Sequence, residues 1–147
     1  MNMPPLELHE SVLNFIRTAR IGHLSTVDST GIPTLLPVCF VTDGKAVFVV
    51  VDDMPKNSEP FKMQQIENLE RNPNMSFGID RYDEDWNRLG WVLLRGLGEA
   101  HKGQSTEQRN AVSMLRDKYE QYRGMNLSKA PIIRMNILGA RHWGQLS

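Results

Sequence analysis

The sequence predicts a mainly β fold with α-helices, in which about six strands form an antiparallel barrel and about three helices lie at its periphery. Two features predict this class. Short apolar or alternating runs follow one another along the chain, and turn sequences such as Asp-Gly separate several of them, as in hairpins. The chain contains neither a G-x-G-x-x-G sequence nor a Walker phosphate loop, so a parallel nucleotide-binding sheet is not expected.

The N-terminal part predicts one helix and three strands. The helix is indicated by apolar residues at helical spacing: Val12, Phe15, Ile16 and Ala19. The strands are expected at residues 21–27, 32–41 and 46–51. The second strand carries Pro33 and Pro37, which lack the N–H that a ladder needs, so we expect it at a sheet edge or with a bulge. An Asp43-Gly44 hairpin leads to the third strand, which is apolar throughout and is expected to be buried on both faces.

The second half predicts two further helices and three further strands. A short helix is indicated by Met63, Ile66 and Leu69 and ends at Asn72-Pro73. A longer helix is expected over 105–122, where Ser105 and Gln108 fit a capping box and Gly124 fits a C-terminal stop. The strands are expected at 75–79, 89–100 and 132–143, and the glycines of the second allow bends or close backbone approach: Gly90, Gly96 and Gly98.

Composition narrows the class of protein. At 147 residues the chain fits one domain over 1–147. Lys+Arg and Asp+Glu are both 17, whereas a protein that grips nucleic acid by its phosphates is usually basic, so no nucleic-acid partner is expected. No apolar run reaches the length of a membrane span, and the acidic start is not typical of a signal peptide. The single cysteine, Cys39, cannot form an internal disulfide, which suits the cytoplasm.

Two lysines and the tryptophans are the candidate ligand contacts. Lys56 lies between a predicted strand and a predicted helix, where backbone N–H groups favour an anion, and Lys62 can reach the same place. The alternative is that both lysines are ordinary surface residues. The indoles can wall a planar ligand, fill a dimer interface or simply pack in a core: Trp86, Trp91 and Trp143.

The remaining reactive residues predict no catalytic machinery of the chain's own. Cys39 lies in an apolar run and is expected to be a small buried hydrophobe rather than a nucleophile. No histidine pairs with another histidine or a cysteine at metal-ligand spacing, so no metal site is predicted. If the chain is an enzyme, a bound cofactor is expected to carry the reaction.

Three stretches of the sequence resemble the pyridoxamine-5′-phosphate-oxidase-like superfamily of split barrels. The first comprises Gly22–Val27, Gly31–Pro33 and Leu36–Phe40; the second comprises Asp52–Lys56, Ile66–Leu69 and Asn72-Pro73; the third comprises Asp80–Trp86, Gly90–Val92 and Gly96. Together they cover roughly residues 12–143. The third stretch resembles a narrower branch, the deazaflavin (factor-420) dependent enzymes of the flavin/deazaflavin oxidoreductases.

The resemblance implies a six-stranded FMN-binding split barrel that forms a homodimer, with two cofactor sites at the interface. It implies that the strand 34–40 lies along the ring system of the cofactor, that Lys56 meets its phosphate, and that the regions of Trp91 and Trp143 approach from the partner chain. The cofactor contacts that it implies are Leu36, Pro37, Val38, Cys39, Val50, Lys56, Asn57, Lys62, Trp91 and Trp143.

The function that the resemblance implies is hydride transfer from a deazaflavin or FMN to a small organic substrate. The alternative is a non-catalytic protein that binds or sequesters a flavin or haem. Thr34 and Cys39 stand where the true oxidases carry an arginine and a lysine, so oxidation of pyridoxamine phosphate is not expected. Met54 stands where the deazaflavin branch often carries a second lysine, which leaves FMN as an alternative cofactor.

Overall fold

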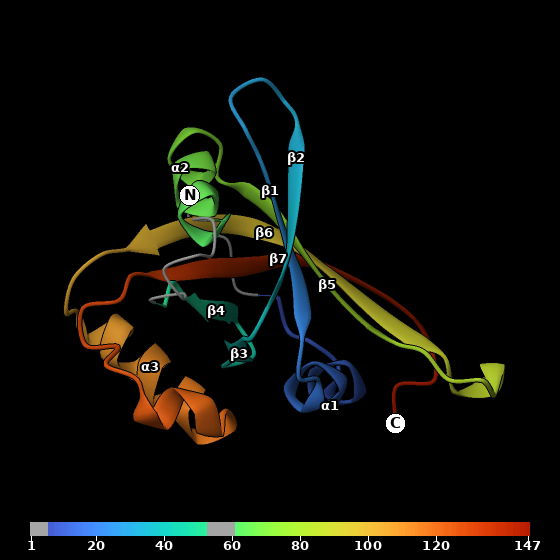
Figure 1. Ribbon diagram of the computed structural model, residues 1–147. Helices are drawn as coiled ribbons and strands as arrows, with labels where there is room; N and C mark the ends of the chain where they lie inside the picture. Colours follow the sequence, from blue (N-terminus) through green and yellow to red (C-terminus); the bar gives the residue numbers. More distant parts are fainter. Residues whose placement is uncertain (1–5, 53–60) are drawn as a thin grey trace.

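The computed structural model describes residues 6–52 and 61–147, except for the side chains of residues 61 and 62. Within these ranges the chain forms a curled antiparallel sheet with helices around it (Figure 1). The strands are β1 (Gly22–Val27), β2 (Pro33–Val38), β3 (Val41–Thr42), β4 (Ala46–Val50), β5 (Asn74–Arg81), β6 (Gly90–His101) and β7 (Ile132–Gly144). The helices are α1 (Glu10–Thr18), α2 (Phe61–Arg71) and α3 (Thr106–Lys118), with 3-10 turns η1 (Trp86–Arg88) and η2 (Glu120–Gly124). The mainly β class with three helices is confirmed.

The sheet curls because two strands that are consecutive in sequence lie at its opposite edges. The strand order is β2-β1-β5-β6-β7-β4-β3, and Cys39 and Phe40 alone join β2 to β3. The predicted single strand over 32–41 was therefore wrong, and the sheet has seven strands rather than six. The chain changes its ladder partner at this link, from Gly22 opposite Val38 to Phe48 opposite Val41. The result is a half-barrel, and the two prolines lie in β2, which is an edge strand as predicted.

The link at Phe40 leaves the sheet ladder, and α3 supplies its hydrogen bonds. The Phe40 N–H donates to the Tyr119 hydroxyl at 3.1 Å. The Phe40 carbonyl oxygen accepts from Lys118 Nζ at 3.0 Å and lies 3.1 Å from the Tyr119 hydroxyl, which is also 2.9 Å from the Arg20 carbonyl oxygen. Because buried backbone groups need partners, Tyr119 stabilises the place where the two sheet edges meet.

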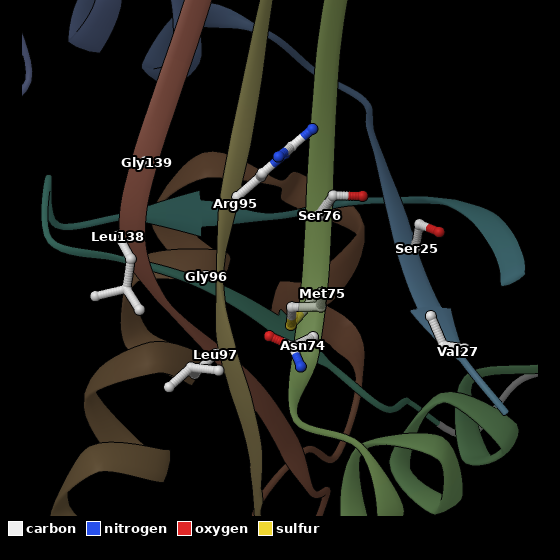
Figure 2. Close-up of a pocket in the computed structure, with 10 residues that line it drawn as sticks. All are labelled: Ser25, Val27, Asn74, Met75, Ser76, Arg95, Gly96, Leu97, Leu138 and Gly139. Carbon is white, nitrogen blue, oxygen red and sulfur yellow. The ribbon is translucent and has the colours of Figure 1, made fainter. Parts of the chain in front are cut away.

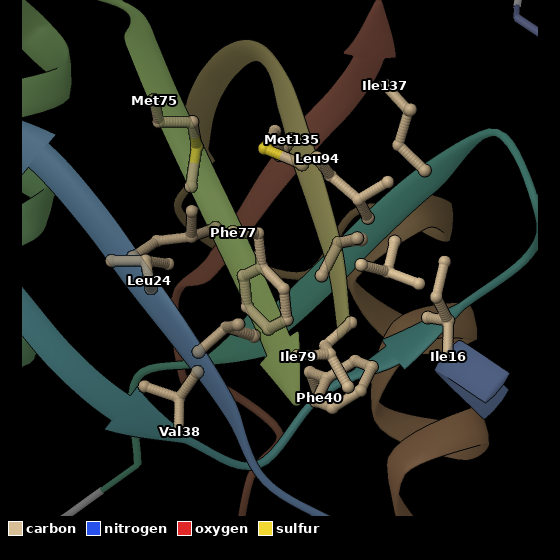
Figure 3. Close-up of a cluster of buried hydrophobic side chains, with 14 of the residues drawn as sticks. Ile16, Leu24, Val38, Phe40, Met75, Phe77, Ile79, Leu94, Met135 and Ile137 are labelled. Carbon is tan, nitrogen blue, oxygen red and sulfur yellow. The ribbon is translucent and has the colours of Figure 1, made fainter. Parts of the chain in front are cut away.

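The core lies inside the curl of the sheet and is built from alternate residues of its strands (Figure 3). Phe40 and Phe77 lie at its centre, with their rings 4.9 Å apart in an edge-to-face arrangement. The strand β4 is buried on both faces, as predicted. Val47 and Val49 face this core, whereas Phe48 belongs to a second cluster, in which α3 packs against the sheet.

The ends of α3 agree only partly with the predicted helix over 105–122. Ser105 Oγ accepts a hydrogen bond from the Gln108 N–H at 3.0 Å, so the predicted N-cap is confirmed. The Gln108 side chain does not complete the capping box, because its amide donates to the carbonyl oxygens of Leu127 and Ala130 instead. The α-helix ends at Lys118, earlier than predicted, because Tyr119 takes an extended conformation that brings its hydroxyl to the Phe40 link.

The glycines of β6 allow close approach, as predicted, and one of them adjoins a bulge in β7. Arg95 is opposite Gly139 and Gly96 is opposite Ile137, so Leu138 is the extra residue of the β7 strand. A Cβ on Gly96 would collide with the carbonyl oxygen of Asn136. The bulge therefore requires glycine here.

Candidate ligand-binding site

The convex side of the half-barrel carries a broad exposed surface, which we call the outer face. It consists of the residues that alternate with the core positions on four neighbouring strands: His23, Ser25, Val27, Asn74, Ser76, Gly78, Asp80, Trp91, Leu93, Arg95, Leu97, Leu138, Gly139, Arg141 and Trp143. Helix α3 packs against the opposite edge region of the sheet, on β4. Among the described residues, the outer face is therefore open to a ligand or to a second protein chain.

A hollow of about 490 Å³ lies on the outer face at the bulge of β7 (Figure 2). Its polar lining includes Ser25 from β1, Ser76 from β5 and Arg95 from β6, and these three residues are cross-strand neighbours in one row of the sheet. Leu97 and Leu138 form apolar parts of its wall. No pattern in the sequence indicates this hollow, because the row forms only when three separate strands pair in this register.

The two predicted tryptophans lie together at the other end of the outer face. Trp91 on β6 is directly opposite Trp143 on β7, and the two residues are 39% and 52% exposed. Both indoles are therefore accessible to a planar ligand or to a partner chain. Trp86 lies in the turn η1 and is still more exposed.

The predicted ring-contacting strand divides its side chains between the two faces of the sheet. Leu36 and Val38 point toward the core, with Val38 fully buried, whereas Pro37 is exposed and lies opposite His23. Cys39, expected to be a small buried hydrophobe, is only half-buried, and it packs against the cluster under α3. Contacts from Val38 to a ligand would have to come from its backbone, and the same holds for the fully buried Val50 of β4.

The predicted phosphate contacts can be placed only in part. Lys56 and Asn57 lie outside the described residues. Lys62 is in the first turn of α2, but its side chain is not among the described parts of the chain. All three assignments stay predictions.

A buried polar cluster lies where α2 covers the β1–β2 hairpin. The hydroxyl of Thr26 bonds to the side-chain oxygen of Gln65 and receives a hydrogen bond from Asn68 Nδ2 at 3.0 Å. Thr34 bonds to the same two side chains, at 3.1 and 3.3 Å. The Thr34 hydroxyl is therefore part of a structural network that holds α2 to the sheet.

Burial changes the acid–base properties of the residues at the Phe40 link. The pKa of Lys118 is lowered to about 8, first by burial of its ammonium group and second by the nearby positive charge of Arg20. Burial raises the pKa of the Tyr119 phenol, so its hydroxyl keeps the proton that it donates. Both groups make hydrogen bonds to backbone, which assigns them a structural role.

A second hollow, of about 680 Å³, lies between α3 and the β3–β4 hairpin. Its arginine, Arg134, is already neutralised by an ion pair with Glu107 and donates to Asn136 Oδ1 at 2.9 Å. The arginine of this hollow is thus already paired, in contrast to Arg95 of the outer face, for which no partner is found among the described residues. Across residues 6–52 and 61–147 no three His, Cys, Asp or Glu side chains converge as metal ligands do, and no helix there has the length and apolar character needed to cross a bilayer.

Comparisons with known proteins identify the fold. No protein-family model and no curated protein sequence matches the chain. Among solved structures, HutZ, the haem storage protein from Vibrio cholerae, is 17% identical with a TM-score of 0.70, over 92% of this chain and 94% of that one. A conserved hypothetical protein from Mycobacterium tuberculosis is 19% identical with a TM-score of 0.71, over 97% and 88% of the two chains.

A pyridoxamine 5′-phosphate oxidase candidate from Lactobacillus delbrueckii also matches. It is 16% identical to this chain with a TM-score of 0.61, and the match covers 95% of this chain and 99% of that one. These similarities extend over nearly whole chains at low sequence identity, so they describe the fold. The chain therefore has the split-barrel fold that haem-binding proteins and pyridoxamine-5′-phosphate-oxidase-like proteins share.

Proposed function

We propose that this chain forms a homodimer that binds a flavin-type cofactor, either a deazaflavin (factor-420) or FMN, and transfers hydride to a small organic substrate. The observation that carries the proposal is the exposed Trp91–Trp143 pair on a partly apolar sheet face that no described segment covers. Exposed indoles provide flat apolar surfaces against which an aromatic ring system packs. The split-barrel fold, shared with a pyridoxamine 5′-phosphate oxidase candidate, agrees with such a ligand.

The residues of the chain would bind and orient the cofactor. The backbone of the strand from Leu36 to Cys39 would lie along the ring system, and Lys56 would neutralise the phosphate through a charge-assisted contact. The Trp91–Trp143 pair of the partner chain would cover the ring and keep water from it. Bound in this way, the cofactor supplies the hydride chemistry, and the protein supplies position and shielding.

The proposed dimer follows from the apolar residues on the outer face and its flank. Large side chains exposed there are Leu35, Trp91, Leu97, Leu138 and Trp143. A monomeric protein rarely leaves such a concentration of apolar surface in water, so a second copy is the partner that we propose for it. Sedimentation of the purified protein tests this, and a monomer that binds cofactor with undiminished affinity would contradict it.

Titration of the purified protein with FMN and with the deazaflavin, side by side, tests the cofactor assignment. We expect Lys56→Ala to weaken binding of the preferred cofactor at least tenfold, because a hydrogen bond to a charged group contributes about 1.5–3 kcal/mol. Lys45→Ala is the control, since Lys45 is an exposed lysine of another loop, in the β3–β4 hairpin. Equal affinity of wild type and Lys56→Ala would remove Lys56 from the site.

A second experiment separates an enzyme from a binding protein. A bound deazaflavin is reduced with a glucose-6-phosphate dehydrogenase system, and its reoxidation is followed with a panel of small organic substrates. Substrate-dependent reoxidation supports the oxidoreductase. Stable reduced cofactor across a broad panel supports a non-catalytic binding protein.

Haem binding is the second candidate function, and one structural observation favours it. His23 lies half-exposed on the outer face, and its Nδ1 is 3.7 Å from Asp80 Oδ1. An imidazole with one nitrogen near a carboxylate can present the other to iron, and the carboxylate fixes its orientation. The structural neighbours described as haem storage and haem-binding proteins agree with this candidate. A Soret band that appears on adding haem, and that His23→Ala removes while His142→Ala does not, would support it.

A further inference from the structure

Three polar side chains in the hollow of the outer face have no partner within the described chain. The Arg95 guanidinium makes no hydrogen bond or ion pair to any described residue, and neither the Ser25 nor the Ser76 hydroxyl is bonded to one. Arg95 is exposed at the surface of the hollow. Asn74, a fourth polar residue of the lining, donates from its side chain to Asn72 Oδ1 at 3.0 Å. In the hollow beside α3 it is the arginine itself that is paired, Arg134 with Glu107.

The geometry of these three side chains suits an anion. Ser25 is opposite Ser76, and Ser76 is opposite Arg95, so the three stand in one row on adjacent strands, which are about 4.8 Å apart. Figure 2 shows the Arg95 side chain extending toward the strand that carries Ser76. A guanidinium offers a planar fork of N–H donors that matches carboxylate and phosphate oxygens, and each hydroxyl adds a further donor.

The acidic residues nearest along the same strands are engaged elsewhere. Asp80, on the strand of Ser76, faces His23 at 3.7 Å. Glu99, on the strand of Arg95, is hydrogen-bonded to His101 at 3.0 Å. The positive charge of Arg95 is therefore available to a molecule from outside the chain.

The walls of the hollow favour a ligand that is partly apolar. Leu97 and Leu138 are 42% and 41% exposed, and the β7 bulge adds Leu138 as an extra residue beside the row. Gly139, opposite Arg95, keeps the hollow open because it carries no side chain. A ligand with an apolar body and one anionic end could pack against the two leucines and bind the arginine at the same time.

We propose that this hollow is a binding site for the carboxylate or phosphate group of a small molecule with an apolar body. The group is held by Arg95 with Ser76 and Ser25, and the apolar body contacts Leu97 and Leu138. The site goes beyond the proposed function, since it does not require a flavin, and in the proposed dimer it would lie at the interface between the two copies. Its anion can come from a separate substrate or from the cofactor, and the experiment below distinguishes the two sources.

Calorimetric titration with phenyl phosphate and benzoate, against neutral benzyl alcohol, tests the site. We expect Arg95→Gln to lower the affinity for phenyl phosphate at least tenfold, because a charge-assisted contact is lost. The affinity for benzyl alcohol, which carries no charge, should not change. Ser76→Ala, a milder change, should weaken phenyl phosphate by about twofold to tenfold. Arg141→Gln is the matched control, since Arg141 is an exposed arginine of the same face, opposite Leu93.

Competition identifies the source of the anion. Displacement of phenyl phosphate by FMN but not by riboflavin assigns the site to the phosphate of the cofactor. Simultaneous binding of phenyl phosphate and FMN assigns the site to a separate substrate. Both outcomes support an anion site. Equal affinities of wild type, Arg95→Gln and Arg141→Gln overturn it. So does an Arg95→Gln variant that dissociates the dimer without weakening phenyl phosphate, because Arg95 then pairs with an acid of the second copy.

The outcomes for this site are separable from those for the proposed function. Phenyl phosphate binding that depends on Arg95, with no affinity for FMN or deazaflavin, supports the hollow and contradicts the flavin assignment. Flavin binding that depends on Lys56, with no affinity for phenyl phosphate or benzoate, does the reverse. Circular dichroism of each variant establishes that it is folded before it is titrated.

Discussion

Removal of a single oxygen atom, in Tyr119→Phe, tests how the split in the sheet is held. The Tyr119 hydroxyl accepts from the Phe40 N–H at 3.1 Å and lies 2.9 Å from the Arg20 carbonyl oxygen. Phenylalanine fills the same volume, so the change removes these hydrogen bonds and little packing. Phe40 is completely buried, so water cannot replace the lost acceptor.

The expected loss follows from which groups are left without partners. The Phe40 carbonyl oxygen keeps its hydrogen bond from Lys118 Nζ, so the Phe40 N–H is the buried group that loses its partner. A buried donor without an acceptor costs about 1–3 kcal/mol. For a domain of this size, each kcal/mol corresponds to a change of roughly 2–4 °C in Tm. We therefore expect the variant to unfold about 2–12 °C below the wild type.

Urea unfolding followed by circular dichroism measures the free energy directly. Tyr82→Phe is the control, because Tyr82 is 66% exposed, and we expect it to stay within about 0.5 kcal/mol of wild type. A Tyr119→Phe variant that also stays within about 0.5 kcal/mol, with an unchanged m-value, would refute the role of the hydroxyl. The β2–β3 link would then not depend on α3.

Two further predictions concern the same region and the bulge. Burial and Arg20 lower the pKa of Lys118 to about 8. Between about pH 8 and pH 10 the unfolded chain therefore binds a proton that the native chain does not, so the contribution of Lys118 to the free energy of unfolding increases with pH. Lys118→Met should lack that contribution in urea titrations at several pH values, and a parallel pH profile would contradict the assignment. Gly96→Ala should lower the free energy of unfolding by about 1–3 kcal/mol, because its Cβ meets the Asn136 carbonyl oxygen, whereas Gly139→Ala should stay within about 0.5 kcal/mol; equal Tm values of the two variants would oppose this.

Local patterns accounted for most of the secondary structure. The Asp43-Gly44 turn is a hairpin in which Asp43 Oδ1 accepts from the Lys45 N–H at 2.8 Å and Gly44 has a positive φ. Helix α2 ends at Arg71, before Pro73, as expected. These features depend on residues close in sequence, whose backbone preferences act before any tertiary contact forms.

The strand count was wrong for a reason that lies outside local pattern. The apolar run through Cys39 and Phe40 reads as one strand, yet the chain there exchanges one edge of the sheet for the other. The early end of α3 has a related cause, because Tyr119 is drawn into the hydrogen bonds of Phe40, 79 residues away in sequence. The local sequence around Tyr119 or Phe40 does not indicate that the two residues will be hydrogen-bonded.

Some residues of the candidate site were identified from the sequence, and others were found only in the tertiary structure. The sequence left Trp91 and Trp143 as ligand, interface or core residues, and the pairing of β6 with β7 brings them together on the outer face, where both are exposed. Lys56 is a prediction from a loop position and a resemblance, and titration is its test. Arg95 was not identified, since an arginine between apolar residues has no distinctive spacing.

The sequence by itself determined the class of fold, most of the helices and strands and the hairpin turns, because periodicity and turn chemistry act over a few residues. Only the tertiary structure decided that the sheet splits at Phe40 and that Ser25, Ser76 and Arg95 form one row. The physical reason is strand register. A shift by one residue reverses which side chains face outward, and register is set jointly by the buried faces of strands far apart in the chain.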